Sequence, residues 1–353
     1  MSISLRMRVW LPGVMAVVLL AVALWRPAPP AAPRAHVVTR LMMSTLMEIT
    51  LPGLDEAQES EGARRAFEAM AKVEREMSPF DPSSPLSRVN AGPRGAWHRV
   101  PLDLARVVRA ALAFQALSGG KFDPGLRPLT EAWGFSVDAP PTVPPPAALL
   151  DRWLALRVRS SRLPVELRDA PGDEAASEVR LADESVGLDL GGIAKGYAVD
   201  QAIAALRGAG VNHGIVNAGG NLRAIGDKGG APWRVGVQDP RREETIVAVL
   251  PLRGDRSIST SGDYERYFLH EGERYHHILD PETARPSRSG VISATVATAD
   301  AMSADALSTI VFILGAEKGL ALLSGIPGAE GMVILSDGSQ RATPGWVMEP
   351  VKP

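Results

Sequence analysis

Apolar side chains recur at helical spacing in two long stretches of the chain. Residues 57–77 predict an amphipathic helix, because apolar residues recur every three or four positions from Ala63 to Met77. Residues 102–117 predict a second helix, and the Ser-Gly-Gly sequence that follows is a typical helix end. Alternating polar and apolar positions in residues 45–51 predict a strand. This mixture indicates an α/β or α+β domain.

Two further patterns concern the organisation of that domain. Residues 178–181 and 186–190 have the composition of short strands, and the Asp-Glu-Ser sequence between them predicts a hairpin. The proline-rich residues 139–146 predict a loop or an extended spacer, which makes them a candidate boundary between two lobes.

The first 35 residues have the pattern of a targeting segment. Arg6 and Arg8 precede an apolar run over residues 9–25, and a stretch rich in proline and alanine follows. This order is typical of an export signal. The prolines make a poor cleavage site, so an uncleaved membrane anchor is favoured over a cleaved peptide. A buried N-terminal core helix fits less well, because the proline-rich tail would separate it from the fold.

Composition excludes several classes of function. The chain has 353 residues, a formal net charge of −2 and only 5% aromatic residues, so it lacks the basic surface and stacking platforms of nucleic-acid-binding proteins. It has no cysteine, which excludes disulfides, thiolate metal sites, a cysteine nucleophile and a lipidated N-terminal cysteine.

A glycine pair between a predicted strand and a helix is the strongest local signal. The segment runs from Leu188 through Asp189, Gly191-Gly192 and Lys195. Backbone N–H groups in such a turn can approach an anionic ligand at the helix N-terminus, and Lys195 can reach a phosphate. Asp189 can accept hydrogen bonds from a ribose or a ring. A tight strand-to-helix turn with a solvated lysine explains the same pattern equally well. A second turn, at residues 216–221, is interpreted as a β-turn.

A carboxylate and a hydroxyl share one face of a third predicted helix. Asp305 and Thr309 are four residues apart and lie opposite the apolar stripe of that helix. Such oxygen ligands suit Mg²⁺, which takes few protein ligands and completes its shell with water and phosphate oxygens. For the pair alone, a role of Asp305 near the helix N-terminus as a cap is the more common explanation.

A histidine and two aromatic loops complete the candidates. His277 lies three residues before Asp280 and is a candidate general base, although the two side chains need not touch. Phe80 and Phe122 lie in loops rich in glycine and proline. Aromatic side chains in such loops can wall a flat ring, but they more often plug a loop onto the core.

Taken in order, these segments resemble the ApbE family of FAD:protein FMN transferases over nearly all of residues 40–320. The motifs that carry the resemblance are Met43-Ser44-Thr45, Met77-Ser78-Pro79-Phe80, Phe122-Asp123-Pro124, Asp189 to Gly196, Ser259 to Tyr264, His277 to Pro281 and Ala304 to Thr309. The resemblance implies an α+β, T-fold-like body with a mixed sheet and a central flavin cleft, so that residues 36–353 form one flavin transferase domain after residues 1–35.

The resemblance also implies the chemistry and the residues that perform it. The family uses Mg²⁺ to cleave FAD, joins FMN to a threonine of an acceptor protein and releases AMP. Asp305, Thr309 and a backbone oxygen near Gly192 are then expected to bind the metal, and His277 to be the base. The residues expected to line the FAD site are Met43, Phe80, Lys121, Phe122, Asp123, Asp189, Lys195 and Ile278.

The same resemblance implies a location and a partner. Family members are typically exported and associated with the membrane, which agrees with the N-terminal pattern and places the chain on the periplasmic side of the inner membrane. The acceptor is expected to be a flavoprotein with a motif of the form Asp/Ser-Gly-Ala/Ser-Thr. Two other functions stay open: an Mg²⁺-dependent pyrophosphatase that passes FMN to water, and a flavin-binding envelope protein without catalysis.

The chain departs from the family pattern at three places. Ser44 replaces the glycine of a Met-Gly-Thr motif, and Ala284 replaces the glycine of Asp-Pro-x-Thr-Gly-x-Pro. Where the family usually has Thr-Val-Gly-Pro-Leu, this chain has Gly125-Leu126-Arg127-Pro128-Leu129, which places a charge near the expected cleft. None of these changes removes an expected metal ligand or the base.

Overall fold

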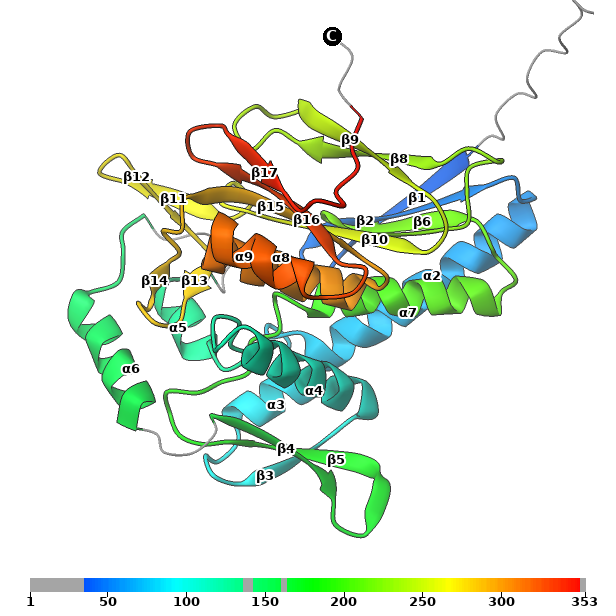
Figure 1. The fold of residues 1–353 in the computed structure, drawn as a ribbon. Coiled ribbons are helices and arrows are strands. Elements are labelled where there is room, and N and C mark those ends of the chain that lie inside the picture. Colours follow the sequence, from blue (N-terminus) through cyan, green and yellow to red (C-terminus); the bar gives the residue numbers. More distant parts are fainter. Residues whose placement is uncertain (1–34, 136–141, 160–163, 350–353) are drawn as a thin grey trace, which may run out of the picture. The chain divides into compact units, whose positions relative to one another are not determined.

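An antiparallel sheet of eight strands is the centre of the computed structural model, which describes residues 35–135, 142–159 and 164–349 (Figure 1). Each strand pairs with its neighbours in antiparallel register, so the expectation of a mixed sheet is wrong for this sheet. In sheet order the strands are β1 (Ala35–Met42), β2 (Thr45–Pro52), β6 (Gly214–Ala218), β7 (Asn221–Ile225), β10 (Arg256–Gly262), β15 (Val291–Thr298), β16 (Glu330–Leu335) and β17 (Gln340–Ala342).

Four helices cover one face of this sheet (Figure 1). They are α2 (Glu56–Met77), α7 (Ala194–Gly208), α8 (Ala301–Leu314) and α9 (Ala316–Ser324). The main hydrophobic core lies between them and the sheet, and includes Met47, Phe67 and Val216. Helix α8 packs on β10 and β15, and α7 packs between α2 and α8. This arrangement brings the N-terminal turn of α7 against the side of α8.

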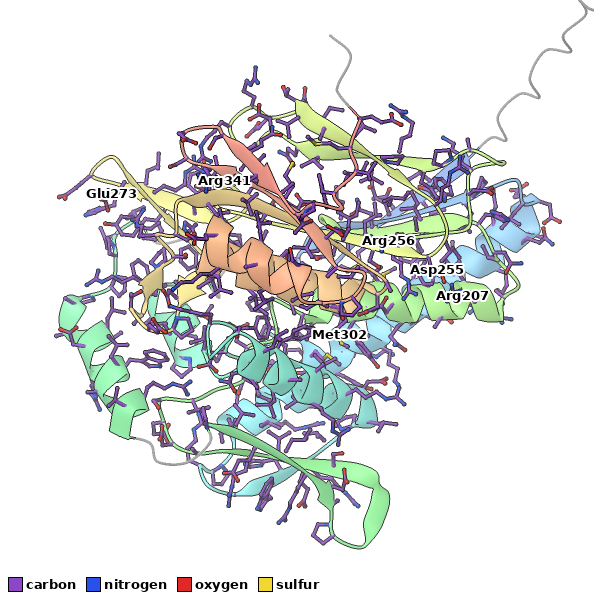
Figure 2. The ribbon with its side chains drawn as sticks, viewed as in Figure 1. Arg207, Asp255, Arg256, Glu273, Met302 and Arg341 are labelled. Carbon is purple, nitrogen blue, oxygen red and sulfur yellow. The ribbon has the colours of Figure 1, made fainter. Side chains whose placement is uncertain are left out.

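Asp200 on α7 fixes the start of α8. Its carboxylate accepts hydrogen bonds from the backbone N–H groups of Ala301 and Met302, both at 2.9 Å, and is paired with Arg223 on β7. A carboxylate at a helix N-terminus satisfies otherwise free N–H groups and complements the helix dipole. At the C-terminal end of α7, Arg207 pairs with Asp255 in the turn before β10 (Figure 2). Helix α7 is therefore tied to the sheet layer at its middle and at its C-terminal end.

The opposite face of the sheet is covered by β8 (Trp233–Gln238) and β9 (Ile246–Leu252), which form a separate hairpin (Figure 1). A second hydrophobic cluster fills this interface and includes Trp233, Leu250 and Ile258. Because helices cover one face and this hairpin the other, every residue of β15 is buried.

The remaining elements lie beyond the helical layer or beside it (Figure 1). Helices α3 (Pro85–Ala91) and α4 (Leu102–Leu117) contact a small sheet made of β3 (Trp97–Val100), β4 (Val165–Ala170) and β5 (Asp173–Leu181). An aromatic cluster around Trp133 joins α5 (Arg127–Ala132) and α6 (Ala147–Arg159) to two short hairpins. These are β11 (Tyr267–His270) with β12 (Glu273–His276), and β13 (Leu279–Asp280) with β14 (Arg285–Pro286).

The predicted helices and the predicted strand near the N-terminus are confirmed. Helix α4 has the predicted bounds, and α2 and β2 each differ from theirs by a single residue at one end. The β-turn interpretation of residues 216–221 is also confirmed, since Gly219 and Gly220 close the β6–β7 hairpin with φ values of 56° and 88°. Both glycines adopt the left-handed conformation that such two-residue hairpin turns require.

The predicted hairpin across residues 178–190 is wrong. Residues 178–181 belong to β5, which pairs with β3 and β4. The backbone of residues 186–190 instead bonds to a distant segment: Gly187 donates to Gly125, and Asp189 donates to Pro124 at 2.8 Å. The side chain of Asn90 satisfies both backbone groups of Leu188. The apolar pattern of residues 186–190 correctly indicated that their apolar side chains are buried, but it did not indicate which segment pairs with their backbone.

The candidate boundary does not separate two lobes, because the described residues between 35 and 349 form one compact unit. Part of the proline-rich segment, residues 139–141, lies outside the described residues, as does the apolar run over residues 9–25. Within the part of the chain that the structure describes, no helix has the length and apolar character needed to cross a membrane.

Candidate active site

One cleft of about 430 Å³ collects every residue predicted for the site. Its walls come from the β1–β2 turn, the loop after α2, the segment before α5, the glycine pair before α7, the end of β10, the link from β12 to β13, and α8. The predicted residues that line it are Met43, Phe80, Lys121, Phe122, Asp123, Asp189, Gly192, Lys195, His277, Ile278, Asp305 and Thr309.

Asp305, Thr309 and Gly192 meet in one part of this cleft. Asp305 is 4% exposed, and burial raises the pKa of its carboxyl group, while the charge of Lys195 acts in the opposite direction. A side chain at Gly192 would bring its Cβ to 3.4 Å from Oγ1 of Thr309 and 3.1 Å from the ring of Phe122. The absence of a side chain there leaves the backbone open beside the hydroxyl.

The interpretation of Asp305 as a helix cap is wrong. The N-cap of α8 is Asp300, whose side chain accepts a hydrogen bond from the backbone N–H of Ser303 at 2.8 Å. Asp305 lies more than a turn further along and accepts from the backbone N–H of Gly196 at 2.9 Å. Helix α8 is also buried on both sides, because the sheet covers its apolar stripe and α7 covers the face of Asp305.

The donor set around Asp305 fits a magnesium ion. No group of three or more His, Asp or Glu side chains suited to a metal occurs among the residues that the structure describes. A metal site at Asp305 would therefore offer a single carboxylate, together with the Thr309 hydroxyl and a backbone oxygen near Gly192. These are hard oxygen donors, and an ion that binds them needs further oxygens from water or from a substrate phosphate, as Mg²⁺ usually does.

The glycine pair before α7 folds into a turn that Asp189 and Lys195 both stabilise. Oδ1 of Asp189 accepts from the N–H of Gly191 at 3.0 Å, and Oδ2 accepts from the hydroxyl of Thr130 at 2.7 Å. Nζ of Lys195, in the first turn of α7, donates to the carbonyl oxygen of Gly191 at 3.1 Å. The sequence allowed either a tight strand-to-helix turn or part of a ligand site. The two interpretations are compatible, since the segment is a tight turn and also lines the cleft.

His277 is held as a neutral imidazole at the edge of the aromatic cluster. Burial, and then the nearby His276 and Lys195, lower the pKa of His277 to about 3. Its ring meets Phe135 edge-on, and its Nδ1 is buried without a hydrogen-bond partner among the described residues. An imidazole that stays neutral at pH 7 can accept a proton from a reacting hydroxyl.

Asp280 pairs with Lys121. Nζ of Lys121 lies 3.0 Å from Oδ1 of Asp280 and 2.7 Å from Glu282. The hydrogen bonds and charges of these two carboxylates raise the pKa of Lys121 against the opposing effect of burial, so it stays a cation beside the cleft. His277 and Asp280 are therefore close in sequence but make separate contacts.

Three predicted side chains form the apolar and aromatic parts of the wall. Phe122 is buried and meets Phe114 edge-on, whereas Phe80 is half-exposed. The guanidinium of Arg127 lies 6.0 Å from the Phe80 ring centre and is held by Glu131 at 2.6 Å. The charge expected near the cleft is thus present beside the aromatic ring of Phe80. Ile278 is buried within the main core.

Asp123 lines the cleft, but its carboxylate is fully used within the protein. Oδ1 accepts from the N–H of Gly125 at 2.8 Å and from Gln115 at 3.0 Å, and Oδ2 is paired with Arg157. Burial raises the pKa of Asp123 despite that pairing. These contacts shape the loop that carries Phe122, so the side chain of Asp123 acts through this loop.

The other two departures from the family pattern both occupy left-handed backbone positions. Met43 and Ser44 form the β1–β2 turn with φ values of 49° and 59°, and the N–H of Met43 donates to Glu74 at 2.7 Å. Ala284 has a φ of 56° and is fully buried, and its carbonyl oxygen accepts from the indole of Trp133. Both loops thus keep the left-handed backbone conformation that glycine adopts easily, although neither position is a glycine.

Several cleft residues were missed from the sequence. Ser261 and Asn221 reach the cleft from β10 and from the start of β7, and Glu74, Glu265 and Arg266 line its walls. Ser261 lies in a motif that carries the family resemblance, so its position was marked without a role. The two glutamates and the arginine have no local pattern that distinguishes them from a solvated helix or loop.

The chain is similar to known proteins over most of its length. The sequence model of the ApbE family matches residues 43–333. A FAD:protein FMN transferase of Rhodobacter capsulatus is 33% identical over 306 residues, which cover 87% of this chain and 56% of that protein. One of Treponema pallidum is 33% identical over 324 residues, which cover 89% of this chain and 88% of the relative. The match thus spans little more than half of the first relative but most of the second.

Solved structures match the fold over most of the chain. A crystal structure of the ApbE protein of Thermotoga maritima has a TM-score of 0.78 and 32% identity, and the match covers 88% of this chain and 97% of that one. The flavin transferase ApbE of Vibrio cholerae has a TM-score of 0.73 and 28% identity, with 88% and 98% covered. The mixed helix-and-sheet architecture is therefore shared.

Proposed function

The chain belongs to the ApbE family, and from that premise we propose that it transfers FMN from FAD to a threonine of an acceptor protein and releases AMP. The observation that carries the proposal is the convergence of the Asp305–Thr309–Gly192 group and His277 on one cleft of about 430 Å³. A volume of this size suits a nucleotide-sized ligand. Phosphoryl transfer needs positioned charge and a base more than covalent help from the protein, and this cleft provides both.

The proposed reaction forms one bond to phosphorus and breaks another, and a residue of the cleft accepts the proton. The acceptor threonine oxygen bonds to the phosphorus on the flavin side of FAD, and the bond from that phosphorus to the AMP phosphate breaks. The hydroxyl proton passes to His277, and the electron pair leaves on AMP. His277 suits this role because it lines the cleft and its Nδ1 has no hydrogen-bond partner among the described residues, which leaves this nitrogen available to a hydroxyl.

The remaining groups position the diphosphate and neutralise its charge. Asp305, Thr309 and the backbone at Gly192 would hold Mg²⁺, which neutralises phosphate oxygens when it is bound. Lys195 lies close enough to lower the pKa of both His277 and Asp305, and as a cation that lines the same cleft it would help to neutralise these phosphates. Phe80 and Phe122 supply flat apolar surface for a ring.

One assay separates this function from its two alternatives. The protein is mixed with FAD, MgCl₂ and an acceptor domain that carries the threonine motif, and the acceptor is followed by intact mass spectrometry with and without EDTA. A metal-dependent FMN adduct on the threonine supports the transferase. AMP and free FMN without an adduct support the pyrophosphatase, and bound FAD without either product supports a carrier.

We further propose that the chain is exported and held by its N-terminal segment at the periplasmic side of the inner membrane. The support is the order of basic, apolar and proline-rich residues over positions 6–33, which lie outside the described residues. Protease added to spheroplasts should degrade the chain, and carbonate extraction should leave it in the membrane fraction. A chain protected from protease, or recovered in the soluble fraction, contradicts this location.

A further inference from the structure

Strand β10 presents a row of serine hydroxyls to helix α8. Ser257, Ser259 and Ser261 are alternate residues of the strand and therefore lie on one face, and α8 packs against β10. Oγ of Ser261 lies 2.8 Å from Oγ of Ser308 and 3.3 Å from Oγ1 of Thr309. Ser261 thus contacts an expected metal ligand from the strand side of the cleft.

The direction of these hydrogen bonds follows from counting protons, since each hydroxyl has only one to donate. Ser308 donates to the carbonyl oxygen of Asp305 at 2.9 Å, as serines within helices commonly do. Ser261 must then donate to Ser308. Ser259 does not compete, because its proton goes to Oδ1 of Asn221 at 2.5 Å.

Ser261 is consequently left as an acceptor toward Thr309. The alternative acceptor for the Thr309 proton is the carbonyl oxygen of Asp305 at 3.4 Å. Its two lone pairs are already used, one by the hydroxyl of Ser308 and one by the backbone N–H of Thr309 in the helical i→i−4 hydrogen bond. With its proton directed at Ser261, the Thr309 hydroxyl turns its lone pairs toward the cleft. A neutral hydroxyl binds a cation through a lone pair, so its proton has to point away from the ion.

We propose that Ser261 is a positioning residue that orients the Thr309 hydroxyl for Mg²⁺. The inference rests on the proposed function, because it assigns Thr309 to the metal. Hydrogen-bond partners behind a metal ligand fix its orientation, and their removal weakens metal affinity by about 10- to 100-fold. Removal of Ser261 should therefore weaken Mg²⁺ binding and leave FAD binding unchanged.

The test compares Ser261→Ala with Ser257→Ala on the same face of the same strand. The hydroxyl of Ser257 is buried and has no hydrogen-bond partner among the described residues, which makes it a matched control. MgCl₂ is titrated calorimetrically into each metal-free protein, and FAD affinity is measured separately in EDTA. We expect about 10-fold weaker Mg²⁺ binding for Ser261→Ala, an unchanged FAD affinity, and wild-type values for Ser257→Ala.

Each contrary result has a defined meaning. Equal Mg²⁺ affinity in the wild type and Ser261→Ala overturns the inference, as does a variant that loses FAD affinity alone, because Ser261 would then contact the substrate directly. If Ser261→Ala fails to fold, Ser261→Thr decides, since it keeps the hydroxyl and should restore Mg²⁺ affinity; failure to do so overturns the inference. A wild-type protein that binds no Mg²⁺ contradicts the metal assignment of the proposed function instead.

Discussion

The backbone N–H of Gly196 donates to the carboxylate of Asp305 over 2.9 Å, and the two helices that carry these residues touch at this point. A side chain at Gly196 would bring its Cβ to 2.2 Å from the carbonyl oxygen of Ala301 and 2.8 Å from Cβ of Asp305. Glycine is therefore required here by the close approach of α7 to α8. The same contact holds the proposed metal ligand in place.

Gly196→Ala should destabilise the fold and weaken Mg²⁺-dependent turnover. The nearest clash is with a backbone atom, so the helices must separate, which typically costs about 1–3 kcal/mol. Gly208→Ala, at the end of the same helix with open space around it, should leave the stability unchanged or raise it by up to about 1 kcal/mol. Urea unfolding of both variants measures the difference. A loss for both, or for neither, would show that the contact between the helices is not decisive.

Asp305→Asn should abolish Mg²⁺-dependent turnover while the protein stays folded. The asparagine keeps an oxygen for the Gly196 N–H but removes the charge, whereas alanine would leave that buried N–H unpaired at a cost of about 1–3 kcal/mol. Asp300→Asn is the matched control, because asparagine caps a helix about as well as aspartate. MgCl₂ should raise the melting temperature of the wild type and of Asp300→Asn only. A rise for Asp305→Asn would exclude Asp305 as a ligand.

His277→Asn should still bind FAD but should transfer FMN to the acceptor about 10²- to 10⁴-fold more slowly, the usual range for loss of a general base. The backbone N–H of residue 277 donates to the Arg266 carbonyl oxygen, and this bond persists in the variant. Asp280→Asn is an informative comparison, because Asp280 follows closely in sequence but pairs with Lys121. Its transfer rate should fall much less. Equal losses for the two variants would contradict the assignment of the base.

Sequence periodicity predicted the elements that depend on neighbours along the chain. The bounds of α2 and α4 follow from apolar spacing and from local end signals, which a single sequence contains. The prediction for residues 186–190 was wrong because the partners of this segment, Gly125 and Asn90, lie far away in sequence. Alternation reports which side chains are buried but does not identify the segment that pairs with them.

The same distinction applies to the site. Motif resemblance selected residues that the fold does bring to one cleft, but it gave no information about their partners. Asp305 was interpreted as a cap because it is an aspartate near the start of its helix. The residue that caps the helix is another aspartate, Asp300, earlier in the sequence. Ser261 had no visible role because its function depends on the approach of α8 to β10. Contacts between distant elements decide such roles, and a single sequence does not specify them.

Stability should fall between pH 7 and pH 5 in a way that depends on His276. Burial is the main cause that lowers the pKa of His276 to about 4, and its Nε2 donates to the Ser287 carbonyl oxygen. The unfolded chain has an ordinary histidine pKa of about 6.5, so it binds more protons than the folded chain between these two values. Stability is therefore lost on acidification through this window, by about 2 kcal/mol at pH 5 relative to pH 7.

The comparison with His276→Gln isolates this effect from that of the other titrating groups. Urea unfolding of both proteins at pH 7, 6 and 5 gives the difference in unfolding free energy at each pH. The stability advantage of the wild type should shrink, or its deficit should grow, by about 2 kcal/mol from pH 7 to pH 5. Parallel pH profiles would mean that His276 titrates normally in the folded protein.

Ser44→Gly should stabilise the β1–β2 hairpin. Ser44 has a φ of 59°, where a side chain costs about 1–2 kcal/mol and glycine costs nothing. Glycine also gains entropy in the unfolded chain, so the expected net gain is at most about 1 kcal/mol. Ser44→Val is the opposing variant, because a β-branched side chain is least tolerated at positive φ. Thermal unfolding should rank glycine above serine and serine above valine; the reverse order would show that the turn does not hold this conformation in solution.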